Sequence, residues 1–185
     1  MTAVENLLTS PDTAGVWNLV PGRSTIAFQN KTFWGLMNVK GTFGDFSGDG
    51  QVTGKGAVFG RIDIRAASLN TGLRMRDRHL RSQEFFDVEK YPEISLVVTG
   101  AEPADGERAE LRASLTVKGI TRPIDLPVTA GKRDDGTIAV SGRSTLDRSD
   151  FEVTGNMMAV MQQGWQRGRV DDLDDPKGAP SNGTD

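Results

Sequence analysis

Apolar and polar residues alternate with a period of two along most of this chain, and this feature restricts its fold more than any other. A period of two places alternate side chains on opposite faces of a β-strand, so the pattern predicts strands with one buried face. It recurs in segments that are separated by turn signals such as Gly48-Asp-Gly50 and Asp134-Asp-Gly136. The alternating segments are 26–28, 39–43, 58–66, 94–98, 111–117, 124–130 and 138–146.

Short strands joined by glycine-containing turns favour an antiparallel sandwich or an up-and-down barrel. A parallel sheet would need helical crossovers, and the sequence has room for one helix, over residues 72–87. In that helix we expect Leu73, Met75, Leu80 and Phe85 to pack inward. We therefore expect an all-β fold, an antiparallel β-barrel with one helix between strands.

The 185 residues suit one domain with tails. Residues 1–15 are mixed in character, and we expect a mobile leader there. Residues 16–160 carry the alternating pattern and form the expected barrel domain. Residues 161–185 are an atypical C-terminal stretch, and from Asp171 the sequence is acidic and rich in proline and glycine, as in disordered tails.

Composition excludes several kinds of partner and site. The net charge is −3 and no long basic run occurs, so we do not expect nucleic-acid binding. The absence of cysteine excludes disulfides and thiolate sites, and a single histidine excludes a multi-histidine metal site within one chain, so we expect no metal and no cofactor. No segment is apolar over 18 residues, and the N-terminus does not have the pattern of a signal peptide. We expect a cytoplasmic location, although an exported protein whose signal had been removed would have the same sequence.

Several inward positions carry small residues, which leave space inside a barrel. An eight-stranded barrel is just wide enough to be filled by its side chains or to hold one small ligand. The small inward residues therefore favour a cavity over a filled core. They are Gly41, Gly60, Ala66, Ala113, Ala130 and Gly142.

Two groups in the expected helix could carry chemistry. His79 could pair with Asp77 as a general base, but residues two apart on a helix point in different directions, which favours a surface histidine. Arginine guanidinium groups match phosphate oxygens in a fork geometry, so Arg74, Arg76, Arg78 and Arg81 could contact an anionic headgroup. A solvated helix face is the simpler interpretation of these arginines.

The sequence resembles the YceI-like polyisoprenoid-binding domains over about residues 17–155. The most specific stretches are Arg76-Asp-Arg-His-Leu-Arg-Ser-Gln-Glu-Phe-Phe-Asp-Val-Glu-Lys-Tyr-Pro-Glu-Ile94 and Leu115-Thr-Val-Lys-Gly-Ile-Thr-Arg-Pro-Ile124. Shorter matches are 22–28, 39–48 and 146–151. The resemblance implies an extended lipocalin-like barrel, a long apolar channel for an isoprenoid or fatty lipid, and frequently a homodimer.

The sequence departs from the family pattern after residue 155, where family members have one more clean alternating strand. Here residues 156–170 lack that alternation. We therefore expect the closing strand to be absent, shortened or unusual, and full closure of the barrel is in doubt.

These observations favour a non-catalytic lipid carrier. Two alternatives are a lipid-modifying enzyme that uses Asp77 and His79 at the barrel mouth and a stress-related scaffold with a filled core. The candidate headgroup contacts are Lys31, Arg76, Arg78 and His79. The residues expected to line the ligand site are Ile26, Phe28, Phe43, Ile62, Ile64, Phe86, Leu96, Val98, Leu115 and Val117.

Overall fold

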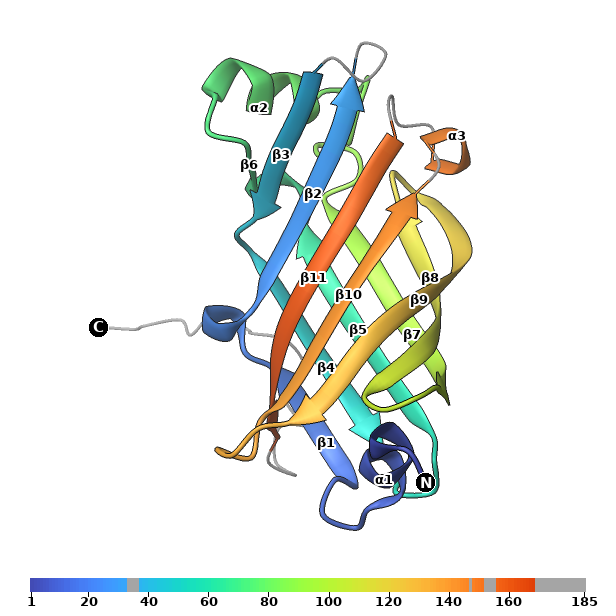
Figure 1. The fold of residues 1–185 in the computed structure, drawn as a ribbon. Helices are drawn as coiled ribbons and strands as arrows, with labels where there is room; N and C mark the ends of the chain where they lie inside the picture. The colour runs from blue at the N-terminus through green and yellow to red at the C-terminus, as the bar shows by residue number, and fades with distance from the viewer. Residues whose placement is uncertain (33–36, 147, 152–155, 169–185) are drawn as a thin grey trace, which may run out of the picture.

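The computed structural model describes residues 1–32, 37–146, 148–151 and 156–168. Within these ranges the chain forms one antiparallel sheet of eleven strands with short helices at its ends (Figure 1). The elements are α1 (Ala3–Thr9), β1 (Gly15–Leu19), the 3-10 helix η1 (Pro21–Arg23), β2 (Thr25–Thr32), β3 (Met37–Phe43), β4 (Phe46–Val52), β5 (Val58–Arg65), the 3-10 helix η2 (Ala66–Ser68), β6 (Leu69–Asn70), α2 (Arg74–Leu80), β7 (Glu93–Pro103), β8 (Arg108–Val117), β9 (Ile120–Lys132), β10 (Ile138–Leu146), α3 (Arg148–Phe151) and β11 (Asn156–Arg167).

Eight of the strands close into a barrel, in the order β1-β4-β5-β7-β8-β9-β10-β11. The ring closes because β11 pairs with β10 on one edge and with β1 on the other, where Leu19 lies opposite Trp165. All pairings are antiparallel. Asp134-Asp-Gly136 lies in the β9–β10 turn as predicted, but the prediction of a turn at Gly48-Asp-Gly50 is wrong, because these residues lie within β4 and pair with β5. The prediction of an all-β antiparallel barrel is confirmed.

The expectation of an absent or shortened closing strand is wrong. Strand β11 has 12 residues and pairs with β10 along nine positions, from Ile138–Trp165 to Leu146–Met157. Its other edge pairs first with β2, over residues 156–162, and then with β1. The barrel therefore continues past residue 160, which was the expected end of the domain.

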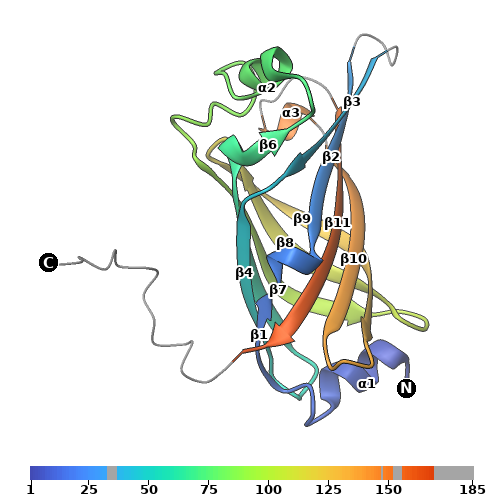
Figure 2. The same ribbon diagram turned by 90° about the vertical axis from the view of Figure 1, so that its left-hand side faces the viewer.

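Strands β2 and β3 extend from β11 toward the end of the barrel where α2 lies (Figure 1). The two-residue strand β6 pairs with the end of β3, and the chain then enters α2. Figure 2 shows α2 at one end of the barrel and α1 at the other. The two ends of the barrel are therefore covered by different parts of the chain.

Inward and outward faces alternate as the sequence predicts. In β8, for example, Ala113, Leu115 and Val117 are buried and the residues between them are not. A β-bulge between Val98 and Gly100 in β7 shifts this alternation by one residue, because it places an extra residue in one strand of a pair.

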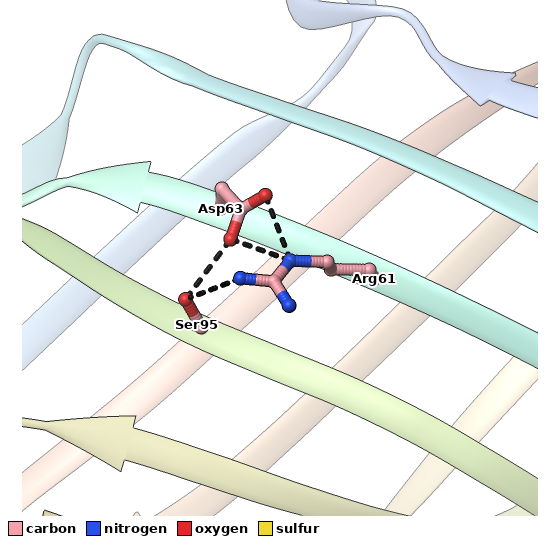
Figure 3. A network of polar contacts seen from close by, with 3 residues as sticks. All are labelled: Arg61, Asp63 and Ser95. Atoms are coloured by element: carbon pink, nitrogen blue, oxygen red, sulfur yellow. Dashed lines mark hydrogen bonds and ion pairs between the residues drawn. The ribbon is translucent and has the colours of Figure 1, made fainter. Parts of the chain in front are cut away.

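The outer surface carries polar contacts between neighbouring strands. Arg61 of β5 donates from Nε to the two carboxylate oxygens of Asp63, at 2.9 and 3.0 Å, and the Ser95 hydroxyl of β7 donates to Asp63 at 2.9 Å (Figure 3). The hydrogen bond with Asp63 raises the pKa of Arg61 above its usual value. This network lies on the opposite side of the sheet from Ile62 and Ile64, which are buried inside the barrel.

The expected helix over residues 72–87 is shorter than predicted, because α2 ends at Leu80. After it, the Ser82 hydroxyl bonds to the His79 carbonyl oxygen and the Phe86 amide bonds back to the Leu80 carbonyl oxygen. This turn directs Phe86 into the core, where 2% of the residue is exposed. Leu80 is buried and Phe85 partly so, as predicted, but Leu73 and Met75 are exposed.

Residues 1–15 are not the mobile leader that we expected. Thr2 caps α1 through a capping box, in which the Glu5 amide donates to the Thr2 hydroxyl and the Thr2 amide donates to the Glu5 carboxylate. Val4 and Leu8 of α1 are buried. The Leu8 carbonyl oxygen accepts from Gly56, which anchors α1 to the β4–β5 turn.

Among the described residues, none of the helices is both long and apolar enough to cross a lipid bilayer.

Candidate functional site

An apolar cavity of about 140 Å³ lies inside the barrel at the end that α1 covers. Its wall is almost entirely apolar, and it takes side chains from both sides of the closed ring. Wall residues on the strands include Trp17, Val52, Val58, Gly60, Ile62, Leu96, Val98, Ala101, Ala109, Leu111, Val128, Ala130, Ile138, Val140, Gly142, Gln163 and Trp165.

Helix α1 completes this cavity. Val4, Leu7 and Leu8 line it, at the end where the strands leave the barrel interior open. The sequence interpretation missed these residues because it treated the segment as a leader. The Thr2-x-x-Glu5 capping box directly before two leucines was the signal that could have identified the helix.

The indole groups of Trp17 in β1 and Trp165 in β11 each have polar partners. The Trp17 indole donates from Nε1 to the Thr13 carbonyl oxygen at 2.8 Å, and the Arg167 guanidinium lies 5.3 Å from the Trp17 ring centre. The Trp165 indole donates to the side-chain oxygen of Gln163 at 3.2 Å. These bonds satisfy polar atoms that line an apolar space, where an unmade hydrogen bond is costly.

The expected lining residues divide between the cavity and a filled core. Of the ten, Ile62, Leu96 and Val98 line the cavity. Phe28, Phe43 and Phe86 instead pack on one another toward the α2 end, with ring centres 5.2 to 6.1 Å apart. The other four are buried or nearly so in the core and do not contact the cavity: Ile26, Ile64, Leu115 and Val117.

Small inward residues leave space at some positions only. Gly60, Ala130 and Gly142 line the cavity. At Gly41 the space is taken, because a Cβ atom there would lie 2.5 Å from Cζ of Phe28. A small residue on an inward face therefore lies either beside a cavity or against a large side chain that fills the space, and the sequence does not distinguish the two.

Asp77 and His79 have different partners. Asp77 is 7% exposed, and one of its carboxylate oxygens accepts from the Thr71 amide at 2.9 Å and from the Thr71 hydroxyl. His79 is exposed, with Nε2 3.5 Å from Glu84 and its ring against Phe85. This geometry gives Asp77 a role in holding α2 to the preceding loop and does not pair it with His79.

The headgroup candidates are also separated. Arg76 donates to the hydroxyl and the carbonyl oxygen of Thr71, at 2.8 Å each, so its guanidinium is engaged. Arg78 faces a polar surface depression, which Arg74 and Arg81 also line. Lys31 belongs to β2, but its side chain lies outside the described part of the structure.

Among the described residues, no group of three or more histidine or acidic side chains could hold a metal ion. The apolar cavity is therefore the feature that best suits a ligand.

Comparison with known proteins agrees with this fold. Residues 17–170 match the family model of the YceI-like domain. A UPF0312 protein of Pseudomonas savastanoi pv. phaseolicola is 33% identical over 128 residues, which are 65% of this chain and 67% of that protein. A UPF0312 protein of Enterobacter sp. strain 638 is 32% identical over 132 residues, 66% of this chain and 67% of that protein.

Solved structures show the same barrel. BcnA of Burkholderia cenocepacia superposes with a TM-score of 0.73 at 21% identity, over 79% of this chain and 98% of that one. A polyisoprenoid-binding domain from Saccharophagus degradans superposes with a TM-score of 0.65 at 17% identity, over 82% and 98%. The YCEI protein of Campylobacter jejuni gives a TM-score of 0.59 at 25% identity, over 72% and 87%.

Proposed function

Because this chain belongs to the YceI-like domain family, we propose that it is a non-catalytic carrier that holds an isoprenoid or another long apolar lipid in its barrel. The observation that carries the proposal is the apolar cavity between the strands and α1. Burying apolar surface is worth about 25 cal/mol for each Å², so a lipid chain needs few polar contacts to bind there.

The volume of the cavity limits what the closed barrel can accept. A protein cavity of about 150 Å³ binds one benzene molecule, so the space of about 140 Å³ accepts only one end of a lipid chain. A long chain needs more room, which displacement of α1 would supply because three of its side chains line the cavity. Binding of a long ligand is therefore expected to involve movement of α1.

The ligand class is the part of the proposal that we extend from a relative. The Saccharophagus degradans neighbour is described as a polyisoprenoid-binding domain, and its fold matches this chain. The apolar wall suits such a ligand but equally suits a fatty acyl chain.

The headgroup candidates Arg76, Arg78 and His79 belong to α2, at the end of the barrel opposite the cavity (Figure 2), so for a lipid held in the cavity they stay sequence-based predictions. Lys31 also stays a sequence-based prediction. The separate partners of Asp77 and His79 do not favour the enzyme alternative, and the cavity does not favour a scaffold with a filled core.

The proposal is tested by filling the cavity. Ala130 of β9 lines the cavity, and the neighbouring Thr129 is exposed on the outer face. We expect Ala130→Phe to weaken binding of a polyprenyl phosphate or a fluorescent fatty acid at least tenfold, because the ring occupies the space that the chain needs. Thr129→Phe adds the same ring outside the barrel and should leave binding unchanged. The proposal would be contradicted if the purified protein contained no extractable lipid and bound neither probe.

A homodimer and a cytoplasmic location stay with the proposal as expectations. Analytical ultracentrifugation and cell fractionation test them, since a monomer or an exported protein gives a different result in each.

A further inference from the structure

One side of α2 presents both basic and apolar side chains to solvent. Helical spacing places Arg74, Met75, Arg78 and His79 on this side, and it places Asp77 and Leu80 on the opposite side, where both are buried. Met75 is 85% exposed, and Leu73, at the residue before the helix, is 58% exposed.

Two exposed apolar side chains so close together are unusual in this structure. Among the described residues the other large apolar side chains with comparable exposure are Met1 and Phe59, each on a different part of the fold. A single exposed apolar side chain is normal in proteins and carries no meaning by itself. Leu73 and Met75 matter because of the charges beside them.

The charge at α2 is opposite in sign to that of the whole chain. The chain carries −3, but residues 74–81 hold four arginines and one aspartate, and that aspartate is buried against Thr71. Arg76 and Arg81 donate to neighbouring uncharged oxygen atoms, which leaves their positive charge in place. Arg74 and Arg78 are exposed. The next loop adds Glu84, which lies beside His79, and Asp87 and Glu89, which line the same depression as Arg74 and Arg78.

The position of α2 makes this face accessible. The helix lies at one end of the barrel, far from α1, as both views show (Figures 1 and 2). A flat surface could therefore reach α2 by approaching this end of the barrel.

We propose that the exposed side of α2 is a docking surface for a bilayer that contains anionic phospholipids. Leu73 and Met75 enter the boundary between headgroups and acyl chains, and Arg74 and Arg78 bind lipid phosphates. Basic residues beside exposed apolar side chains are the pattern of helices that lie on membrane interfaces, and guanidinium groups bind phosphate oxygens in pairs. This inference goes beyond the proposed lipid carriage and does not depend on what the barrel holds.

A bilayer explains the surface better than another polyanion does. A nucleic acid or an acidic peptide would use the arginines but would gain little from Met75, which is apolar and 85% exposed. The bilayer uses both kinds of side chain. The experiment therefore changes each kind separately.

The test is co-sedimentation of the full chain with vesicles of phosphatidylcholine, either alone or mixed with phosphatidylglycerol. We expect binding to the mixed vesicles only, and weaker binding at high salt, because salt screens the attraction. Each basic residue near an anionic surface contributes about 1 kcal/mol, so Arg74→Gln/Arg78→Gln should lower the partition coefficient at least tenfold. Leu73→Ser/Met75→Ser should lower it several-fold with no change in charge.

The control variant is Lys132→Gln/Arg133→Gln, which removes the same charge from the exposed β9–β10 turn at the opposite end of the barrel. Its partition coefficient should equal that of the unchanged chain. Equal losses in this control and in Arg74→Gln/Arg78→Gln would overturn the proposal, as would full binding by Leu73→Ser/Met75→Ser, since a charge-only surface would then suffice. Absence of binding to the mixed vesicles would also overturn it.

Failure of this proposal is distinguishable from failure of the carrier proposal. Leu73→Ser/Met75→Ser and Lys132→Gln/Arg133→Gln change exposed residues that neither line the cavity nor are headgroup candidates, so they should keep the lipid-probe affinity that Ala130→Phe removes. The circular dichroism spectra and melting temperatures of all three double variants verify that the barrel is intact.

Discussion

Gly41 lies on the inward face of β3, where an added Cβ atom would be 2.5 and 2.7 Å from two ring carbons of Phe28. That ring also packs on Phe43 and Phe86, so it has little freedom to move away. We expect Gly41→Ala to lower the free energy of unfolding by about 1–3 kcal/mol, as overpacking does in other cores. Chemical denaturation measures the change.

Gly60→Ala is the matched control. Gly60 is also an inward strand glycine, but it lines the cavity, and its Cβ atom would meet Asp49 at 3.4 Å and Val98 at 4.0 Å, which are ordinary contact distances. Its free energy of unfolding should not fall, and we expect it to rise by up to about 1 kcal/mol, because alanine restricts the unfolded chain more than glycine does. Similar losses of stability in both variants would contradict the expectation that Gly41 is tightly packed and Gly60 is not.

Among the described residues, Asp135 is the carboxylic acid whose pKa departs most from its usual value. Hydrogen bonds from the Thr137 hydroxyl and amide, then from Arg23, lower its pKa from 3.8 to about 2. A lowered pKa means that the ionised form stabilises the fold above about pH 4, and that this contribution is lost as the pH falls toward 2. An NMR pH titration of the Asp135 carboxyl carbon measures the value.

Two variants separate the causes of this shift. Thr137→Val removes the hydroxyl, which is the largest cause, so it should raise the pKa of Asp135 more than Arg23→Gln does. Thr137→Ser keeps a hydroxyl and should leave the pKa near 2. A larger rise with Arg23→Gln would mean that the ion pair dominates instead.

At the scale of elements, α1 has a testable role as the cover of the cavity. Leu8 is buried and lines the cavity, so Leu8→Asp places a charge against apolar walls, and we expect α1 to detach. Water then reaches Trp17 and Trp165, which line the same space. In a Trp34→Phe background, acrylamide quenching of the fluorescence should increase about twofold or more.

Asn6→Asp is the control, because it adds the same charge on the exposed side of α1. Its quenching should match that of the Trp34→Phe parent. If Leu8→Asp leaves quenching unchanged, α1 does not cover the cavity in solution.

The strands were predictable from sequence, whereas both ends of the barrel were not. Alternation in β8 and β9 follows directly from which side chains face the core. Helix α1 is only seven residues long, and although its capping box indicates where a helix can begin, no local pattern shows that it packs on the barrel. Strand β11 lacks regular alternation in its sequence, and its pairing with β10, β2 and β1 is imposed by strands far away along the chain.

At the scale of the whole molecule, the cavity should bind a small apolar compound even before α1 moves. Its volume of about 140 Å³ approaches that of an engineered cavity of about 150 Å³ that binds benzene. We expect saturating benzene to raise the melting temperature by a few degrees, because a ligand that binds only the folded state stabilises it. Differential scanning calorimetry measures the shift.

Ala130→Phe should remove this effect and Thr129→Phe should keep it, for the reason given for the lipid probes. An equal shift in both variants would place the benzene elsewhere in the molecule.

The position of the cavity was only partly predictable. The sequence indicated which residues face inward, and Ile62, Leu96 and Val98 do line the cavity. It did not indicate that three phenylalanines fill the α2 end, because their contact joins β2, β3 and the segment after α2 across long distances in the chain. Side-chain periodicity reports the face of a strand but not how far along the barrel axis the interior is filled.

The pairing of β11 with both β1 and β2 has a consequence for biosynthesis. Until β11 leaves the ribosome, β1 and β10 are the unjoined borders of an open sheet, and the future interior is exposed to water and chaperones. Ring closure is then the last step and links residues about 150 positions apart, as Leu19 opposite Trp165 shows. Translation that stalls before residue 156 would therefore leave an unclosed sheet with exposed apolar side chains, which chaperones and proteases would bind.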